Sequence, residues 1–401
     1  MYKKIMVALD NSEWSGHGMA LAIELARLTG ARVTGNHVYA ARLHGERFRQ
    51  LEPGLPERFH QSEALERLRR IHGDLIGRGL GIISDSYLDV FEQRCREAGV
   101  EWKRKALEGR HYAELVKDAR DSAYDLLVVG AYGLGWVDRS TLGSVCERVA
   151  RLVECDLLVA RNGRSPGQGE LVVAIDGSDH SFAALKAALG LTHLYGSRVQ
   201  AVAAYDPFFH GGAFSSLAGV LSGEAARLFR FREQESLHGE IIDTGLESVY
   251  RSHLERAQAI AERQGIALRI EVLEGKPFDA VASHCERVRP SLLVVGRVGM
   301  HHADGVTLGS TAENLLRAVD CNVLVVNRGV GGSGTEAAPS GASQSGGPEI
   351  QWDQEAERRL ERVPRLVRRM ARGRIEAFAR ERGHRVITLE VYEEARRHFG
   401  M

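Results

Sequence analysis

The chain contains 401 residues, which is too many for one ordinary hydrophobic core. This length predicts two or three domains. Its 53 basic and 53 acidic residues cancel to a formal charge of zero, so neither nucleic acid nor an acidic membrane surface is an expected partner. Five cysteines without a CxxC pair indicate reduced thiols, and no apolar run approaches the roughly 20 residues of a membrane helix. We therefore expect a cytoplasmic protein without membrane segments.

Apolar strands alternate with amphipathic helices along residues 1–162. The segment 4–10 is apolar on both faces, which is typical of a strand in a parallel sheet covered on both sides. We predict the strands of this half at 4–10, 32–39, 100–107, 125–129 and 156–160. Helices are predicted at 13–28, 57–76, 84–98, 112–122 and 142–152. The alternation predicts a doubly wound α/β domain with a five-stranded parallel sheet.

The same order of elements returns 166 positions later, as from Gly130 to Gly296, so the chain is a tandem duplication. The stretches 126–144 and 292–310 both begin LLVVG and carry the pattern G-x2-G-x9-G-S. The repeated polar set is Asp10, Ser12, Gly130, Gly133, Gly143 and Ser144 in the first copy, and Asp176, Ser178, Gly296, Gly299, Gly309 and Ser310 in the second. Strands of the second copy are predicted at 171–175, 198–204, 267–273, 292–295 and 322–326.

This polar set has the chemistry of a nucleotide site. In an open α/β sheet the ligand crevice lies outside the carboxyl ends of the strands. If the strand order is 3-2-1-4-5, Asp10 and Gly130 lie on the two sides of this crevice. Asp10 can then bind a ribose hydroxyl or an adenine edge, while Gly143 and Ser144 open a helix whose free amides suit phosphate. The alternative is that each glycine makes a tight turn and each Asp caps a helix. Repetition of the whole set favours the nucleotide site.

The glycine pattern, the preceding LLVVG strand and the Asp of ALDNS and AIDGS resemble the universal stress protein family, specifically its ATP-binding branch. The resemblance implies a Rossmann-like five-stranded parallel fold and ATP, with or without Mg²⁺, at the positions named above. It also implies association through the last strand. The two copies are then expected to pair within one chain through the strands near Leu157 and Val323, or to form a homodimer.

Neither copy contains the GxxxxGK[ST] loop, whose lysine grips terminal phosphates, or an obvious Walker-type carboxylate. We therefore expect a nucleotide sensor or reservoir without catalytic residues, with slow ATP hydrolysis as an alternative.

Two histidines in the long insertion of each copy recur in register. They are His44 and His72 in the first copy, and His210 and His238 in the second. Imidazoles can bind a metal or a tetrapyrrole, or contact phosphate, which makes these residues candidate ligands. The alternative is a turn signature inherited from the duplication, because two histidines per copy are too few for a closed metal site.

The residues after the second copy change in character. Residues 329–348 are rich in Gly, Ser and Ala and predict a flexible linker. Trp352, Leu360 and Val363 lie at helical spacing, so residues 349–401 predict a small all-α domain. The pattern W-x2-E-A-x2-R-L-x2-V-P-x2-V-R, which begins at Trp352, and the later stretches IEAFARERG and VITLEVYEEA resemble the small C-terminal domain of the light-independent protochlorophyllide reductase B subunit. That resemblance suggests a module used near a tetrapyrrole or for docking a protein partner. Its cationic stripe is Arg365, Arg368, Arg369 and Arg372, which suits an anionic partner or else forms a solvated face paired with Glu357, Glu361 and Glu376.

Four segments result: stress domain one at 1–162, stress domain two at 170–328, a linker at 329–348 and a helical domain at 349–401. We expect an ATP-binding regulatory protein of the stress response whose tail docks an unknown partner. The alternative is a tetrapyrrole- or metal-binding carrier that uses the recurring histidines or the tail.

Overall fold

The computed structural model describes residues 1–206, 243–300 and 307–327, and in the tail residues 351–361, 372, 375–376, 378–379, 382, 384 and 386–398. The chain forms two compact units, Met1–Gly332 and Ser333–Met401. Several predicted features lie outside the described residues: His210, His238, Arg365, Arg368, Arg369 and the linker 329–348.

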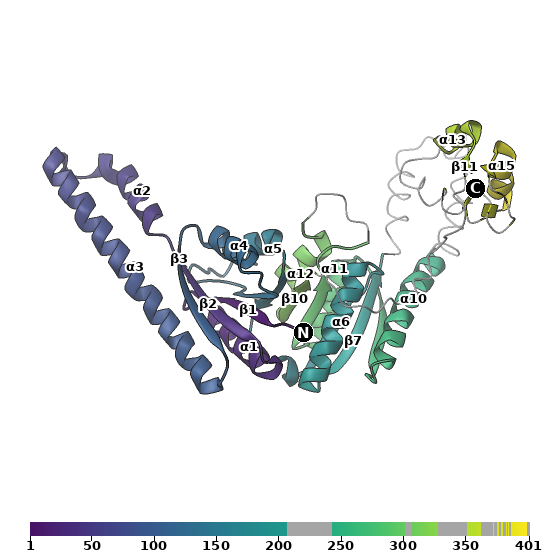
Figure 1. Ribbon diagram of the computed structural model, residues 1–401, viewed down its shortest axis with the longest axis horizontal. Coiled ribbons are helices and arrows are strands. Elements are labelled where there is room, and N and C mark those ends of the chain that lie inside the picture. Colours follow the sequence, from purple (N-terminus) through teal and green to yellow (C-terminus); the bar gives the residue numbers. More distant parts are fainter. Residues whose placement is uncertain are drawn as a thin grey trace. The chain divides into compact units, whose positions relative to one another are not determined.

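The first copy alternates strands and helices as predicted (Figure 1). Its strands are β1 Lys4–Ala8, β2 Arg32–Tyr39, β3 Trp102–Glu108, β4 Leu126–Gly130 and β5 Asp156–Ala160. Its α-helices are α1 Glu13–Thr29, α2 Ala41–Leu51, α3 Ser62–Ala98, α4 His111–Asp121 and α5 Ser144–Leu152. The strands are parallel in the order β3-β2-β1-β4-β5, so the predicted order 3-2-1-4-5 is confirmed.

The second copy repeats this order, and the two sheets join edge to edge. Its strands are β6 Glu170–Ala174, β7 Arg198–Tyr205, β8 Leu268–Glu274, β9 Leu292–Gly296 and β10 Asn322–Val326. Its described α-helices are α6 Asp179–Tyr195, α10 Asp243–Glu262, α11 Pro277–Val288 and α12 Ser310–Ala318. Strand β5 pairs antiparallel with β10, with Leu158 opposite Leu324, which makes one ten-stranded sheet. The last strands near Leu157 and Val323 therefore pair within the chain.

Helices cover both faces of this sheet, and each face has one apolar core that runs through both copies. Every strand alternates its side chains between the two faces, so strands buried on both sides are apolar throughout. One core contains Leu21, Phe91, Leu185 and Leu254, from α1, α3, α6 and α10. The other contains Leu115, Val149, Val281 and Leu315, from α4, α5, α11 and α12.

The predicted helices at 57–76 and 84–98 are in fact one continuous helix, α3. Gly77, Gly79 and Gly81 lie in its middle, and glycine disfavours a helix by only about 1 kcal/mol per residue, so they weaken the helix without ending it. Helix α2, which the sequence did not predict, packs against α3. No residue of α2 is buried, and the buried residues of α3 begin at Ser84.

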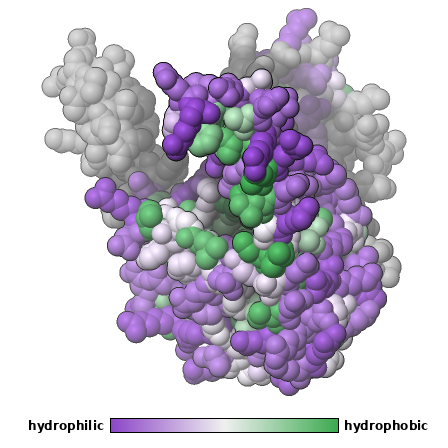
Figure 2. All heavy atoms as spheres, turned by 90° about the vertical axis from the view of Figure 1, so that its left-hand side faces the viewer, coloured by the Kyte–Doolittle hydropathy of each residue, from purple (hydrophilic) through white to green (hydrophobic). Residues whose placement is uncertain are grey.

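We call α2 and residues 62–83 of α3 the arm, because they extend beyond the sheet (Figure 1). Figure 2 looks onto this side of the molecule and shows apolar patches among mostly hydrophilic side chains. The exposed large apolar residues of α2 and α3 are Leu51, Ile71, Leu75, Ile82, Ile83 and Val90. No described helix is both long enough and apolar enough to cross a membrane.

The tail unit is helical, with one addition to the prediction. Helices α13 Gln354–Glu361 and α15 Leu389–His398 share a core with a short parallel pair, β11 Gln351–Trp352 and β12 Val386–Ile387. The module is therefore not all-α, and Trp352 belongs to a strand. Two-residue strands are too short to give a periodic pattern in the sequence. The Oγ1 of Thr388 accepts from the Val391 amide at 3.5 Å, as the side chain of an N-cap residue does at the start of α15.

Candidate functional site

Each copy holds a cavity at the carboxyl ends of its central strands, where the order of the strands reverses. The first, called site one, has a volume of about 680 Å³, and the second, site two, about 540 Å³. The predicted residues that line site one are Asp10, Gly130, Gly133, Gly143 and Ser144. Those that line site two are Asp176, Ser178, Gly296, Gly299, Gly309 and Ser310. Positions about 130 residues apart in sequence therefore meet in each copy.

Asp10 lies between β1 and α1 and is held by the start of that helix. Its Oδ1 accepts from the Ser12 amide at 3.0 Å and from the Ser12 hydroxyl at 2.5 Å. The Ser12 oxygen in turn accepts from the Ser15 amide at 3.2 Å, which makes Ser12 the N-cap of α1. Ser12 is therefore the capping residue and does not line the cavity, while Asp10 keeps Oδ2 directed at the glycine loop.

Site two repeats this turn around Asp176. Its Oδ1 accepts from the Ser178 amide at 2.9 Å and from the Ser178 hydroxyl at 2.6 Å. The Ser178 oxygen caps α6 through the Ser181 amide at 3.1 Å. In addition, Oδ2 accepts from the Met300 amide at 2.9 Å, so the carboxylate is tied directly to the glycine loop of its own copy.

Two glycines of each motif leave space for different neighbours. A Cβ on Gly133 would lie 2.6 Å from Oδ2 of Asp10, and one on Gly299 would lie 2.6 Å from Oδ2 of Asp176. Those two glycines thus admit the carboxylate. A Cβ on Gly130 would instead lie 2.9 Å from the backbone nitrogen of Ser15. Gly130 lines the cavity and also has a packing role, because its missing Cβ lets β4 meet the start of α1.

The change Gly130→Ala is expected to lower the free energy of unfolding by about 1–3 kcal/mol, because the added methyl group meets backbone atoms that cannot move aside. Gly135→Ala is the matched control, since a Cβ there has nothing within 4 Å. Urea unfolding followed by tryptophan fluorescence measures both variants. Equal midpoints would mean that α1 accommodates the methyl group and would contradict the packing role.

A glycine is the N-cap of helix α5 and of helix α12, the two helices that start at the cavities. Gly143 caps α5 and Gly309 caps α12, and neither helix has a side-chain hydrogen bond at its start. The amide of Gly143 donates to the Ala131 carbonyl at 2.7 Å, which fixes the loop in front of the helix. The amides of residues 144–146 therefore have no side-chain cap and lie at the positive end of the helix dipole. This end of the helix lines the cavity and suits an anion.

Aromatic residues distinguish site one from site two. The ring centroids of Trp14 and Tyr132 lie 5.1 Å apart, and those of Trp14 and Trp136 lie 5.5 Å apart. Tyr132 and Trp136 line site one. The positions in the second copy that correspond to Trp14 and Tyr132 are His180 and Val298. We did not predict this cluster, although a tryptophan within the glycine loop was an available signal.

Three histidines, His37, His44 and His111, line site one. Of the predicted pair in the first copy, His44 thus reaches the cavity, whereas the His72 ring stacks on Phe48 in the arm at 4.3 Å. His37 and His111 do not recur in the second copy, and for that reason the sequence comparison passed over them. In the described part of the chain, no three His, Cys, Asp or Glu side chains are placed so that they could hold a metal ion together.

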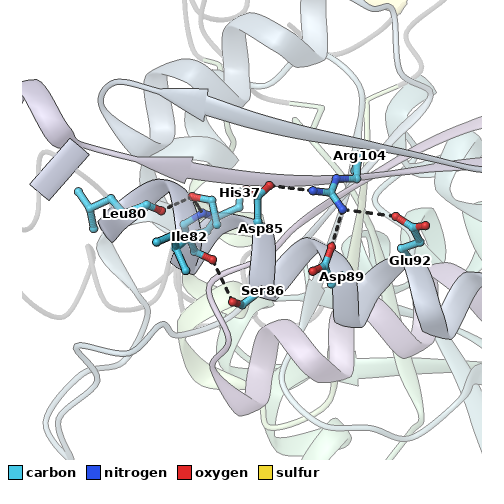
Figure 3. A network of polar contacts seen from close by, with 9 residues as sticks. His37, Leu80, Ile82, Asp85, Ser86, Asp89, Glu92 and Arg104 are labelled. Atoms are coloured by element: carbon cyan, nitrogen blue, oxygen red, sulfur yellow. Dashed lines mark hydrogen bonds and ion pairs between the residues drawn. The ribbon is translucent and has the colours of Figure 1, made fainter. Parts of the chain in front are cut away.

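His37 is the buried member of this group. Its Nδ1 lies 2.7 Å from the Ser84 hydroxyl, which donates to the Leu80 carbonyl at 2.8 Å (Figure 3). Because that hydroxyl has one proton to donate, Nδ1 of His37 carries the hydrogen of the neutral ring. Burial lowers the pKa of His37, the neighbouring His111 lowers it further, and Asp10 opposes the shift. Burial likewise lowers the pKa of His111, against the effect of Asp10 and with that of His44.

We expect the protein to lose stability as the pH falls below about 6.5, the ordinary pKa of histidine. The pKa of His37 is lower in the folded than in the unfolded chain. Below about pH 6.5 the unfolded chain therefore binds more protons than the folded chain. As the pH decreases, the free energy of unfolding decreases by at most about 1.4 kcal/mol per pH unit for one histidine. His37→Gln is expected to flatten the dependence between pH 7 and pH 5, measured by urea unfolding at about five pH values. An unchanged slope would mean that His37 does not contribute.

Arg372 is the one member of the predicted arginine stripe within the described residues. Its Nη1 lies 3.6 Å from a Glu357 carboxylate oxygen, and its Nε donates to Glu376 at 3.2 Å. The guanidinium also lies 5.2 Å from the centroid of the Trp352 ring. For this arginine the contacts are those of a face paired with acidic residues inside the module.

Known proteins match both parts of the chain. The model of the universal stress protein family matches residues 1–161 and 169–327, and that of the proto-chlorophyllide reductase 57 kD subunit matches residues 352–396. A universal stress protein from Methanocaldococcus jannaschii is 27% identical over 170 residues, which cover 42% of this chain and 88% of that protein. The B subunit of a light-independent protochlorophyllide reductase from a Bradyrhizobium species is 48% identical over 52 residues, 13% of this chain and 10% of that protein.

Solved structures agree with the fold of the first unit. A universal stress protein from Archaeoglobus fulgidus has a TM-score of 0.51 and 15% identity, over 81% of this chain and 98% of that one. The match to the reductase spans only about a tenth of that protein's length, so it describes the tail module alone. The family model, in contrast, accounts for both halves of the ten-stranded sheet and for both glycine motifs. The chain belongs to the universal stress protein family, with two stress domains in tandem.

Proposed function

We propose that each stress domain binds an adenine nucleotide, ATP, and that the protein acts in the stress response as a nucleotide-dependent regulator. One observation carries the proposal. In each copy a carboxylate and the start of a helix without a side-chain cap line the same cavity, through Asp10 and α5 in site one and through Asp176 and α12 in site two. A sugar hydroxyl and a phosphate chain need this combination of an acceptor and a set of donors.

The charges of the cavity suggest how the ligand lies. The phosphates belong at the start of α5, where backbone amides and the Ser144 hydroxyl donate hydrogen bonds. Asp10 repels phosphate but accepts well from a ribose hydroxyl, so it belongs beside the sugar. Because metal-ligating side chains do not cluster in the described residues, a Mg²⁺ ion that accompanies ATP would be held chiefly by phosphate oxygens and water.

The tail supplies the output in this proposal. It forms a compact unit of its own with a separate core, which is what a docking module for a protein partner requires. Occupancy of the two sites would then reach the partner through the chain that joins the units.

Analysis of the small molecules that accompany the purified chain tests the proposal. We expect mass spectrometry of the denatured protein to find adenine nucleotide, and calorimetry of the stripped protein to give two ATP sites per chain. Absence of nucleotide together with absence of binding heat would overturn it. Steady release of ADP would favour the slow ATPase, and a strong visible absorption band would favour a tetrapyrrole carrier.

A further inference from the structure

Two arginines make similar contacts from different positions of the repeat: each bonds the glycine loop of its own copy and the last turn of a helix of the other copy. Arg161 follows β5 in the first copy, and Arg297 follows β9 in the second. The residue that corresponds to Arg161 in the second copy is Asn327, and the one that corresponds to Arg297 in the first is Ala131. The arginine has therefore moved from the end of the fifth strand to the end of the fourth.

Arg161 joins the glycine loop of the first copy to a helix of the second. Its Nη2 donates to the Thr141 carbonyl at 3.1 Å, two residues before the N-cap of α5, and also to the Leu316 carbonyl of α12. Its Nη1 donates to the Tyr132 hydroxyl at 3.0 Å, and the guanidinium lies 5.4 Å from the centroid of that ring. The Tyr132 hydroxyl itself donates to the Thr141 carbonyl at 3.1 Å.

Arg297 makes the reverse connection. Its Nε donates to the carbonyl of Thr307, the residue that corresponds to Thr141, and its Nη2 donates to the Arg151 carbonyl of α5 at 2.9 Å. Its side chain lines site two and is 5% exposed. Each copy thus has one arginine that holds its own glycine loop and bonds the last turn of a helix from the other copy. Arg161 reaches α12, which starts at site two, and Arg297 reaches α5, which starts at site one.

The backbone carbonyls that accept hydrogen bonds from Arg161 and Arg297 explain why a guanidinium charge is tolerated at these positions. Arg151 and Leu316 lie in the last four residues of α5 and α12, whose carbonyls lack partners within the helix. A cation there also meets the negative end of the helix dipole. Burial lowers the pKa of Arg297, and no carboxylate forms an ion pair with either guanidinium among the described residues. Backbone carbonyls therefore provide the compensation.

Ion pairs fix the same two helices side by side. Arg317 of α12 pairs with Glu147 of α5 at 2.8 Å, and Arg151 of α5 pairs with Glu313 of α12. Each arginine also pairs with the glutamate four residues earlier on its own helix, at 3.1 Å for Arg151 and 2.7 Å for Arg317. The anchor points of Arg161 and Arg297 are consequently held by the partner helix as well as by the sheet.

We infer that Arg161 and Arg297 are positioning residues for the two nucleotide sites. Each holds the loop in front of a phosphate-binding helix by bonding it to the last turn of the helix from the other domain. Neither site is then complete in an isolated stress domain, and each depends on the other domain for the shape of its glycine loop. The expected effect of these arginines on nucleotide binding rests on the proposed function. The hydrogen bonds by which they hold the glycine loops do not depend on it.

Relocation of the arginine tests the inference most directly. In an Asp10→Ala background, where only site two is expected to bind, Arg297→Ala should weaken ATP binding about tenfold, as for the loss of one or two hydrogen bonds that hold the loop. Adding Asn327→Arg restores the arrangement of the first copy and should recover most of the affinity. Failure of the relocated arginine to restore binding, or wild-type affinity in Arg297→Ala, would overturn the positioning role.

A matched control and a ligand-free measurement separate this inference from the nucleotide proposal. Arg164 donates to the Arg289 carbonyl of the second copy at 2.9 Å without touching a glycine loop, so Arg164→Ala should leave affinity unchanged. Hydrogen exchange of the nucleotide-free protein should be faster at residues 131–143 in Arg161→Ala than in the wild type, and should be unchanged there in Arg164→Ala. If the wild type binds no ATP, the proposed function fails, and this exchange result still decides whether the arginine holds the loop.

Discussion

Asp10→Ala is expected to weaken ATP binding at site one by roughly ten- to a hundredfold and to leave site two intact. Asp10 contributes the acidic side chain that the described cavity holds, and a hydrogen bond to a charged group is worth about 1.5–3 kcal/mol. Asp176→Ala should produce the mirror-image result. Calorimetric titration of the stripped protein with ATP measures both, since each variant should keep one of two binding events.

A charge-matched control keeps this test specific. Asp121 lies at the end of α4, its side chain is 54% exposed, and it does not line either cavity. Asp121→Ala should therefore titrate as the wild type does. Two undiminished binding events in Asp10→Ala would place the nucleotide elsewhere and contradict the proposed arrangement.

Phe91→Ala is expected to reduce the free energy of unfolding by about 3–5 kcal/mol, the usual cost of removing a buried aromatic ring. Phe91 is fully buried and packs against Gly35 of β2, where a Cβ would lie 2.6 Å from the ring. Only four residues of α3 are buried: Ser84, Leu88, Phe91 and Cys95. Loss of the ring therefore removes the largest of the side chains that hold α3 on the sheet.

Phe48→Ala is the matched control for this ring, because Phe48 lies on α2 of the arm, where no residue is buried. Urea unfolding should give a markedly lower midpoint for Phe91→Ala and a nearly unchanged one for Phe48→Ala. A similar small shift for both would mean that α3 is held by its polar contacts. These contacts include the ion pairs of Arg104 of β3 with Asp85, Asp89 and Glu92 (Figure 3).

The sheet was accessible from sequence because its strands are buried on both faces. Such strands are short apolar runs between glycines and polar residues, and β2, β5 and β10 begin and end at the predicted residues. The duplication then doubled every observation. Both copies of the glycine motif pointed to the same strand ends, and the structure gathers both sets around cavities.

Errors arose where a local pattern had more than one physical outcome. We predicted two helices, at 57–76 and 84–98, on either side of three glycines between 77 and 81, but glycine only weakens a helix, and α3 runs through them. Trp352 has helical spacing with later residues, yet it joins a two-residue strand whose partner is more than 30 positions away. Neither outcome could be read from neighbours along the chain.

Sequence alone determined the two α/β domains and the repeated polar set, because each depends on apolar periodicity or on residues that recur at one offset. The strand order 3-2-1-4-5 was a hypothesis that the pairing of the strands confirmed. The tertiary structure alone decided that Gly130 serves packing, that His37 and His111 join His44 at site one, and that Arg161 and Arg297 are equivalent. Comparison of the two copies at the 166-residue offset finds residues that recur at the same position. It overlooks a residue whose role is taken over by a different position in the other copy. The ends of two strands that are adjacent in a sheet can each supply a guanidinium to the same glycine-loop carbonyl and to the last turn of the helix from the other copy, and only the tertiary structure shows this.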